Sequence, residues 1–293
     1  MAERARKGPH DLEHPGGLDL AGVNEPLKKV LFTDLDGTLL DLQDYSYEPA
    51  LPALEHVKRH QVPIIFCTAK TLAENEYYQE LLGVHDPFIV DNGGAIFIPE
   101  QYFSFEFEAR NQGKYRVIEL GASYNELRAA LQAIRAETGF SITGFGDMTA
   151  EEVAGDANLT LEQAVRAKRK SYNESFIFDE PPEKAAELVA KIEAKGFAVT
   201  HGGRYYNIHG KNADKGRAVQ KLTELFKREY GSVLTIGVGD SRNDIPMLQA
   251  VDQPAVVRNK KGGWLEFGAR NLYRAAGEGP NGWVEVVRKF IND

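Results

Sequence analysis

The sequence predicts an α/β protein in which a mixed α+β domain is inserted between two halves of a parallel sheet. Short, continuous apolar runs occur near both ends of the chain, and such runs are typical of strands that are buried on both faces. Segments with a helical spacing of apolar residues separate these runs, which gives the strand–helix–strand order of a parallel sheet. From residue 95 to 207, strand-like and helix-like pieces alternate differently.

Composition limits the class of protein. The chain has 293 residues, of which 42% are hydrophobic, enough for one large domain or two modest ones. Its net charge of −8 argues against a nucleic-acid or anionic-membrane partner. The single cysteine, Cys67, cannot form an internal disulfide, and we interpret it as a small buried apolar residue. We therefore expect a cytoplasmic protein and leave its oligomeric state open.

The N-terminal half begins with a leader, residues 1–28, that lacks the apolar segment of a secretory signal and that we expect to be flexible. The first strand is expected from Lys29 to Thr33, the second over 62–67 and the third over 87–90. A helix over 48–60 separates the first two strands and completes a βαβ unit.

The C-terminal half returns to the same pattern. We expect a helix over 213–230, a strand over 232–238, a helix from about 244 to 251 and a strand over 255–257. In the middle, the expected strands are 95–98, 115–120, 175–178 and 198–201, and the expected helices are 124–138, 161–170 and 182–195. The predicted domains are thus a core of 29–94 plus 208–293 and an inserted domain of 95–207.

Carboxylates follow the first strand directly, in the sequence Asp-Leu-Asp-Gly-Thr from Asp34 to Thr38. Ligands of open α/β sheets bind at the carboxyl ends of the strands, which is where this segment falls. Gly37 allows the tight turn that would aim Asp34 and Asp36 at one point. The alternative is a solvated turn that caps the next helix, for which Asp and Gly are ordinary residues.

A second acidic segment, Gly239 to Asp244, follows the strand expected over 232–238. It could equally be the N-cap of the next helix. The sheet topology nevertheless sets it beside the first segment, so that Asp34, Asp36, Asp240 and Asp244 would converge. Four carboxylates in one cleft repel each other unless a cation intervenes or some are protonated. Since no His or Cys is clustered with them, the sequence predicts a Mg²⁺ site.

Two further residues lie at element ends. Thr68 ends the second strand, where its hydroxyl could donate to a phosphate oxygen or simply cap the following helix. Lys215 stands at the start of a helix, where the helix dipole disfavours a cation, and this weakly indicates an anionic partner.

Together these motifs resemble the four motifs of the haloacid-dehalogenase-like phosphatases, and the resemblance covers nearly everything after the leader. It implies a Rossmann-like core with a cap of the second type. It also implies that Asp34 is the nucleophile, that Asp36 is the general acid and base, and that Thr68 and Lys215 hold the phosphoryl group. Mg²⁺ would be bound by Asp34, by the main-chain carbonyl of Asp36 and by Asp240. Ser241, Asn243 and Asp244 would support these ligands or orient Lys215.

Finer strings resemble the mannosyl-3-phosphoglycerate phosphatase family, namely 66–71, 87–99, 144–149, 200–206 and 212–217. The resemblance implies hydrolysis of mannosyl-3-phosphoglycerate, and in some members of the glucosyl analogue, to mannosylglycerate, which is a compatible solute. The partner would be a small phosphorylated sugar-glycerate. The candidate substrate-binding residues are Ala69, Lys70, Asn92, Gly93, Gly94, Arg166, Lys168, His201 and Arg204.

Several alternatives remain open at this stage. Asn92 to Gly94 could be only a turn, the basic run from Arg166 to Lys170 could be a solvated helix face, and His201 and Arg204 could only brace the return to the core. At the level of function, the alternatives are another phosphosugar phosphatase (of the sucrose-phosphate or trehalose-phosphate type), a phosphomutase, or a receiver-like signalling module. Asp36 argues against the last, since an acid and base near the nucleophile shortens the lifetime of an acyl phosphate.

Overall fold

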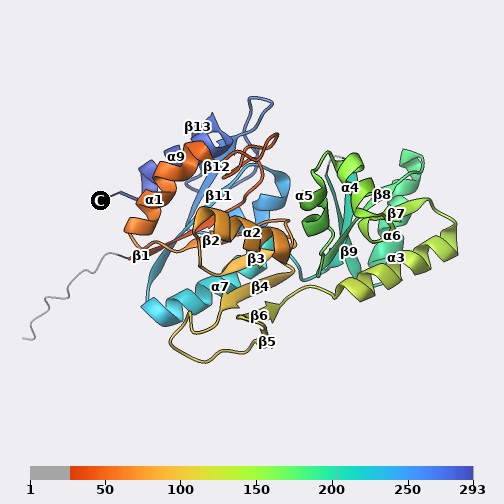
Figure 1. Ribbon diagram of the computed structural model, residues 1–293, viewed down its shortest axis with the longest axis horizontal. Helices are drawn as coiled ribbons and strands as arrows, with labels where there is room; N and C mark the ends of the chain where they lie inside the picture. Colours follow the sequence, from red (N-terminus) through yellow and green to blue (C-terminus); the bar gives the residue numbers. More distant parts are fainter. Residues whose placement is uncertain (1–26, 203, 293) are drawn as a thin grey trace, which may run out of the picture.

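The structure is a computed structural model that describes residues 27–292 apart from 203 (Figure 1). All but the last two residues of the expected leader lie outside the described residues. Within the described part of the chain, no helix is both long enough and apolar enough to span a bilayer.

The main sheet has five parallel strands in the order β13-β12-β11-β1-β2. Their bounds are β1 Lys28–Thr33, β2 Ile64–Phe66, β11 Val233–Gly239, β12 Gln253–Arg258 and β13 Tyr273–Glu278. Strands from both ends of the sequence are therefore neighbours, which confirms the predicted parallel core. Thr33 of β1 pairs with Val238 of β11, so the loops that follow these two strands begin side by side.

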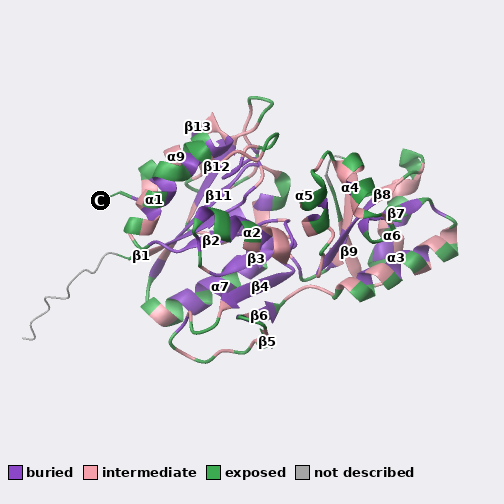
Figure 2. Ribbon diagram, viewed as in Figure 1, coloured by how far each residue is buried: buried purple, intermediate pink, exposed green. Residues whose placement is uncertain are grey.

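Helices cover both faces of this sheet. Successive apolar side chains of β1 point to opposite faces, so both faces must be covered. Leu31 packs into one apolar cluster with residues of α1 (Leu51–Arg59), α2 (Leu72–Leu82) and α9 (Gly279–Phe290). Val30 and Phe32 pack into the opposite cluster, with α7 (Lys215–Tyr230) and α8 (Ile245–Ala250). Figure 2 shows the buried residues concentrated along these strands.

A second sheet of four antiparallel strands extends the core, in the order β3-β4-β6-β5. Its strands are β3 Phe88–Val90, β4 Ala95–Pro99, β5 Arg110–Gln112 and β6 Tyr115–Glu119. The third apolar run was expected in the parallel sheet, but β3 pairs antiparallel with β4, and one parallel bridge between Cys67 and Ile89 links it to the main sheet. A short buried run indicates burial on both faces, not the direction of the partner strand.

Residues 95–119 also differ from the expected domain boundary. Phe97 and Val117 belong to the same apolar cluster as Leu31, and Ile96 and Ile118 belong to the opposite one. This segment therefore packs as part of the core, and we place the cap at about residues 122–209.

The cap is a separate antiparallel sheet in the order β7-β8-β10-β9, with bounds Ile142–Gly144, Asn173–Phe178, Tyr205–Gly210 and Phe197–Gly202 respectively. Its helices are α3 Tyr124–Thr138, α4 Ala150–Ala157, α5 Leu161–Ala167 and α6 Ala185–Ala194. The helices α3 and α6 pack on one face, around Phe176 and Ile208. On the other face, Val153 of α4 and Ala164 of α5 pack with Phe145 and Tyr205, and α5 lies on the side toward the core (Figure 1).

Short 3₁₀ helices complete the chain: η1 Glu48–Ala50, η2 Phe145–Asp147, η3 Pro182–Lys184 and η4 Arg242–Asp244. Reciprocal capping boxes begin four of the α-helices, with Thr71, Ser123, Thr149 and Thr160 as the N-cap residues of α2, α3, α4 and α5. In each box the side chain satisfies a backbone N–H that the helix leaves unpaired.

Candidate active site

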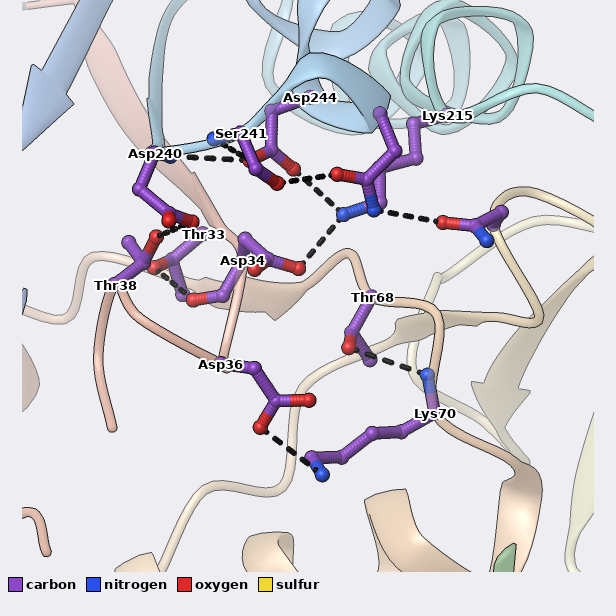
Figure 3. A network of polar contacts seen from close by, with 12 residues as sticks. Thr33, Asp34, Asp36, Thr38, Thr68, Lys70, Lys215, Asp240, Ser241 and Asp244 are labelled. Carbon is purple, nitrogen blue, oxygen red and sulfur yellow. Dashed lines mark hydrogen bonds and ion pairs between the residues drawn. The ribbon is translucent and has the colours of Figure 1, made fainter. Parts of the chain in front are cut away.

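Three carboxylates meet where β1 and β11 end (Figure 3). Asp34 directly follows β1, and its backbone N–H donates to the carbonyl of Val238 in β11 (2.9 Å). One carboxylate oxygen each of Asp34, Asp240 and Asp244 lies within 4.8 Å of the others, and all three side chains are buried. The convergence thus follows from the parallel register of two strands that are about 200 residues apart.

A buried lysine bridges two of these carboxylates. The Nζ of Lys215 lies 2.7 Å from Oδ1 of Asp34 and 2.6 Å from Oδ1 of Asp244. Burial alone would lower the pKa of Lys215, but the charges of Asp244 and Asp34 outweigh it and raise that pKa above its usual range. The ammonium is therefore charged and fixed beside Asp34.

Asp244 uses both of its oxygens within the protein. While Oδ1 accepts from Lys215, Oδ2 accepts from the backbone N–H groups of Asp240 and Ser241, each at 3.0 Å. Asp244 therefore shapes the loop after β11 and holds Lys215. The same loop is tied to the turn after β3, because Nδ2 of Asn243 donates to Oδ1 of Asn92 (3.0 Å).

The charges of this cluster do not balance. Three carboxylates face one ammonium, which leaves two uncompensated negative charges if all the groups ionise. Burial, followed by the charge of Asp244, raises the pKa of Asp34 well above its usual range. The same two causes raise the pKa of Asp240 to about 7. A divalent cation between Asp34 and Asp240 would remove this penalty, and an all-oxygen donor set suits Mg²⁺.

Gly37 allows the two loops to approach. Its φ is +78°, and a Cβ at this position would lie 2.8 Å from Oδ2 of Asp240. The next residue, Thr38, donates its hydroxyl to Oδ1 of Asp240 (3.1 Å). The glycine and the threonine together set Asp240 beside the end of β1.

Asp36 lies apart from the three carboxylates and pairs with Lys70 (Figure 3). The Nζ of Lys70 is 3.0 Å from Oδ1 of Asp36 and 3.6 Å from Oε1 of Glu74, and it lies over the rings of Tyr45 and Tyr78. Burial opposes the charge of Lys70, but the two carboxylates raise its pKa above the usual range. Lys70, which the sequence analysis proposed as a substrate-binding cation, is therefore held by Asp36 and Glu74 of the core.

Thr68 is buried at the end of β2, and its Oγ1 accepts from the backbone N–H of Lys70 (3.2 Å). It does not cap the next helix, because the N-cap of α2 is Thr71. The alternative role that the sequence left open for Thr68 is thus filled by another residue.

A cavity of about 300 Å³ lies between the core and the cap, next to Asp36. Three of the candidate substrate-binding residues, Ala69, Lys70 and Arg166, line it. It is also lined by residues that the sequence analysis missed, namely Tyr45, Glu74, Tyr78, Phe145, Ala157, Leu159, Gln163, Ala167, Lys170 and Tyr205. Lys170 belongs to the basic run noted in the sequence, but nothing in that run distinguished its cavity-facing members.

The remaining candidates lie outside the cavity lining. Gly93 and Gly94 allow close packing, since a Cβ would lie 2.2 Å from the backbone carbonyl of Asp214 or 2.3 Å from Cβ of Tyr172, respectively. Lys168 donates to the carbonyl of Met148, and Arg204 pairs with Asp156 (2.7 Å).

His201 lies on the far face of the cap sheet. It is opposite Tyr206 in the β9–β10 ladder and stacks on that ring at 4.1 Å. Tyr206 in turn stacks on Phe176, within the cluster formed with α3 and α6. Residues paired across a sheet share a face, so His201 is on the side opposite α5 and the cavity.

Comparisons with known proteins agree with this geometry. A family model described as haloacid dehalogenase-like hydrolase matches residues 31–264. The glucosyl-3-phosphoglycerate/mannosyl-3-phosphoglycerate phosphatase of Methanococcoides burtonii is 46% identical over 90% of this chain and 98% of its own length. The mannosyl-3-phosphoglycerate phosphatase of Pyrococcus furiosus is 42% identical over 76% of this chain and 88% of its own. These relatives confirm the family resemblance expected from the motifs.

Among solved structures, the sucrose-phosphatase of Synechocystis, determined with sucrose and phosphate, superimposes with a TM-score of 0.59. It covers 90% of this chain and 98% of its own at 18% identity. At this identity the similarity shows the shared fold of core and cap.

Proposed function

We propose a function for this chain on the premise that it belongs to the haloacid dehalogenase-like hydrolase family, whose model matches residues 31–264. The proposal is a Mg²⁺-dependent phosphatase that hydrolyses mannosyl-3-phosphoglycerate, and also its glucosyl analogue, through an aspartyl-phosphate. The observation that carries it is the buried cluster of Asp34, Asp240 and Asp244 around Lys215 at the carboxyl ends of β1 and β11.

The metal site is proposed from oxygens that the protein leaves available. Asp244 uses both of its oxygens on Lys215 and the loop after β11, so Asp34, Asp240 and the main-chain carbonyl of Asp36 are the proposed ligands. A bound Mg²⁺ would offset the two excess negative charges and draw electron density from the phosphate oxygens.

In the first step, one carboxylate oxygen of Asp34 attacks phosphorus while the other would stay with the metal and Lys215, and the bond from phosphorus to the glycerate oxygen breaks. Lys215, 2.7 Å from Oδ1 of Asp34, fixes the nucleophile and faces the charge that builds on the phosphoryl oxygens, which Thr68 also contacts. Asp36 gives a proton to the departing glycerate oxygen.

In the second step, Asp36 accepts a proton from water, and the resulting hydroxide attacks phosphorus. The bond between phosphorus and Asp34 breaks, so inorganic phosphate leaves and the carboxylate is restored. Since Asp36 pairs with Lys70 at 3.0 Å, we propose that Lys70 holds this carboxylate toward the cavity.

The cavity supports a substrate that is polar and anionic beyond its phosphate. Arg166 and Lys170 bring positive charge to it from the cap, Gln163 brings an amide, and the rings of Tyr78 and Tyr205 offer faces for a sugar. These features fit a glycosylated glycerate, whose carboxylate needs a cation. Because the product would be mannosylglycerate, we also propose a role in compatible-solute synthesis, in the cytoplasm.

The test is release of inorganic phosphate from mannosyl-3-phosphoglycerate with Mg²⁺, beside a panel of glucosyl-3-phosphoglycerate, sucrose phosphate and trehalose phosphate. Asp34→Asn should abolish release, with a loss of about 10³-fold or more. Asp86→Asn is the matched control, because its carboxylate serves the backbone N–H of Ile64 away from the cluster. Hydrolysis of the other sugar phosphates, without either phosphoglycerate, would contradict the substrate assignment.

A further inference from the structure

The turn after β3, from Asp91 to Gly94, contacts both the catalytic loops and the cap, and we name it the joint turn. Asp91 and Asn92 both have positive φ, at 50° and 57°. Asp and Asn adopt this conformation more readily than other non-glycine residues do. The hydrogen-bond partners of the joint turn indicate its role.

On the core side, the joint turn holds the loop that carries Thr68 and Lys70. The backbone N–H of Asp91 donates to the carbonyl of Lys70, and that of Asn92 donates to the carbonyl of Thr68, both at 3.0 Å. Its Asn92 side chain also accepts from Asn243, in the loop after β11. The joint turn is therefore bonded to two loops of the proposed active site.

On the cap side, the joint turn binds a segment that follows α5. Oδ2 of Asp91 accepts from the backbone N–H groups of Ser171 (3.1 Å) and Tyr172 (3.0 Å). Tyr172 is buried against Gly94 and belongs to the main core cluster, and its hydroxyl donates to Glu119 (2.7 Å). This contact adjoins the first chain connection between core and cap, because the backbone N–H groups of Leu120 and Gly121 donate to the carbonyl of Gly94.

The contact of Asp91 with Ser171 and Tyr172 lies next to residues of the cap that line the cavity. Ser171 directly follows Lys170, which lines the cavity together with Gln163 and Arg166. A second contact lies close by, near the C-terminal end of α5, where the hydroxyl of Thr71 donates to the carbonyl of Arg166 (3.0 Å). Two core side chains, Thr71 and Asp91, therefore hold the C-terminal end of α5 and the segment that follows it, which we call the α5 wall.

Asp91 is fully buried, and among the described residues its Oδ1 has no hydrogen-bond partner. A buried carboxylate with an unpaired oxygen is costly, but it forms stronger hydrogen bonds to N–H groups than a neutral side chain does. Burial of the Asp91 carboxylate thus lowers the stability of the folded chain, and what it provides in return is the contact with Ser171 and Tyr172.

We propose that Asp91 is a positioning residue that holds the α5 wall of the cavity in register with Thr68 and Lys70. It acts through Ser171 and Tyr172 and does not touch the reacting atoms. The inference deepens the proposed function and rests on it only for the choice of sugar substrate.

The test compares Asp91→Ala, Asp91→Asn and Asp86→Ala on two substrates, mannosyl-3-phosphoglycerate and p-nitrophenyl phosphate. In Asp91→Ala, we expect kcat/KM for the sugar ester to fall about tenfold or more, mainly through KM, because the cavity wall shifts. Hydrolysis of p-nitrophenyl phosphate, which needs no cap contacts, should change by about twofold at most. Asp91→Asn should recover most of the loss, since its carbonyl oxygen can accept from the same two N–H groups.

Asp86→Ala is the matched control, because it removes a carboxylate that accepts from Ile64 N–H and the Tyr102 hydroxyl in the core, away from the cap. The proposal would be overturned if Asp91→Ala lost kcat/KM equally on both substrates or kept the wild-type kcat/KM for the sugar ester. It would also be overturned if Asp86→Ala lost kcat/KM for the sugar ester selectively.

A second measurement does not depend on the substrate. Amide hydrogen exchange at Ser171 and Tyr172, without ligand, should be faster in Asp91→Ala than in the wild type. Unchanged exchange would show that Asp91 does not hold this segment. If the wild type does not hydrolyse the mannosyl ester, the proposed function fails, while this exchange result still decides the role of Asp91.

Discussion

At the scale of single residues, Asp91 carries a charge in a place that disfavours it. Burial raises its pKa to about 6, although Lys170 and the N–H groups of Ser171 and Tyr172 act in the opposite direction and Glu74 adds to the rise. The folded chain therefore holds the proton of Asp91 more tightly than the unfolded chain does.

This difference predicts a pH dependence of stability. Because the folded pKa of Asp91 exceeds the unfolded value, the free energy of unfolding falls as the pH rises from about 4 to about 6, and the whole cost is present above that range. Asp91→Asn should therefore be more stable than the wild type at about pH 8, by up to about 3 kcal/mol. At about pH 4 the gain should nearly vanish.

Urea denaturation of both proteins at the two pH values measures this difference. Asp86→Asn, measured in the same way, controls for the general effect of removing a buried carboxylate. An Asp91→Asn gain of the same size at both pH values would show that ionisation of Asp91 is not its source.

At the scale of elements, the N-cap of α2 has two functions. Thr71 accepts from the backbone N–H of Glu74 in a capping box, and its hydroxyl also reaches the carbonyl of Arg166 in the cap. Ser123 caps α3 with the same reciprocal pattern, and the partners described for its side chain belong to that capping box.

We predict that Ser123→Ala loses about 1 kcal/mol of stability with its cap, and that Thr71→Ala loses more, because buried Thr71 also loses its hydrogen bond to Arg166. Only Thr71→Ala should raise KM for the sugar phosphate, by about threefold to tenfold, since only Thr71 holds the α5 wall. Thermal melts and steady-state kinetics measure the two effects. An equal KM change in both variants would contradict this division of roles.

The elements also show what could be predicted from the sequence. Asp34 and Asp240 lie directly after β1 and β11, and Thr68 follows β2 by two residues. The burial of these strands is visible as apolar runs, so topology alone predicts that the three residues lie at one sheet edge. The direction of β3 could not be predicted in this way, because β3 is buried beside both β2 and β4. An apolar run gives burial but not pairing.

The cap residues were harder to predict for a related reason. Whether His201 or Tyr205 faces the cavity depends on the register of β9 against β10, and a one-residue difference reverses the face. Tyr205, Phe145 and Lys170 come together from separate elements, so no local spacing identifies them. Residues 95–119 were assigned to the cap because their strand-like pieces do not show which sheet they join.

At the scale of the whole molecule, the uncompensated carboxylates predict that the folded protein binds a cation more tightly than the unfolded chain does. A few millimolar Mg²⁺ should therefore raise Tm, since a ligand of the folded state stabilises it. Asp240→Asn should abolish this shift and the activity, because it removes one of the proposed ligands. EDTA should stop phosphate release, and added Mg²⁺ should restore it.

Differential scanning calorimetry with and without Mg²⁺ measures the shift, and Asp86→Asn, which keeps the cluster intact, should respond like the wild type. A Tm that is indifferent to Mg²⁺ in the wild type, or full activity in EDTA, would contradict the proposed metal site.

The two passages of the chain between core and cap run in contact: a Cβ on Gly210 would lie 2.5 Å from the backbone nitrogen of Ala122. A short bridge could therefore splice Leu120 to Lys211 and delete the cap as one module. The deletion would also remove Tyr172, whose side chain is buried in the main apolar cluster of the core. A core without its cap would have a cavity the size of the Tyr172 ring beside Gly94. An exchange of caps between relatives would therefore require a cap that supplies a side chain of matching shape at this position.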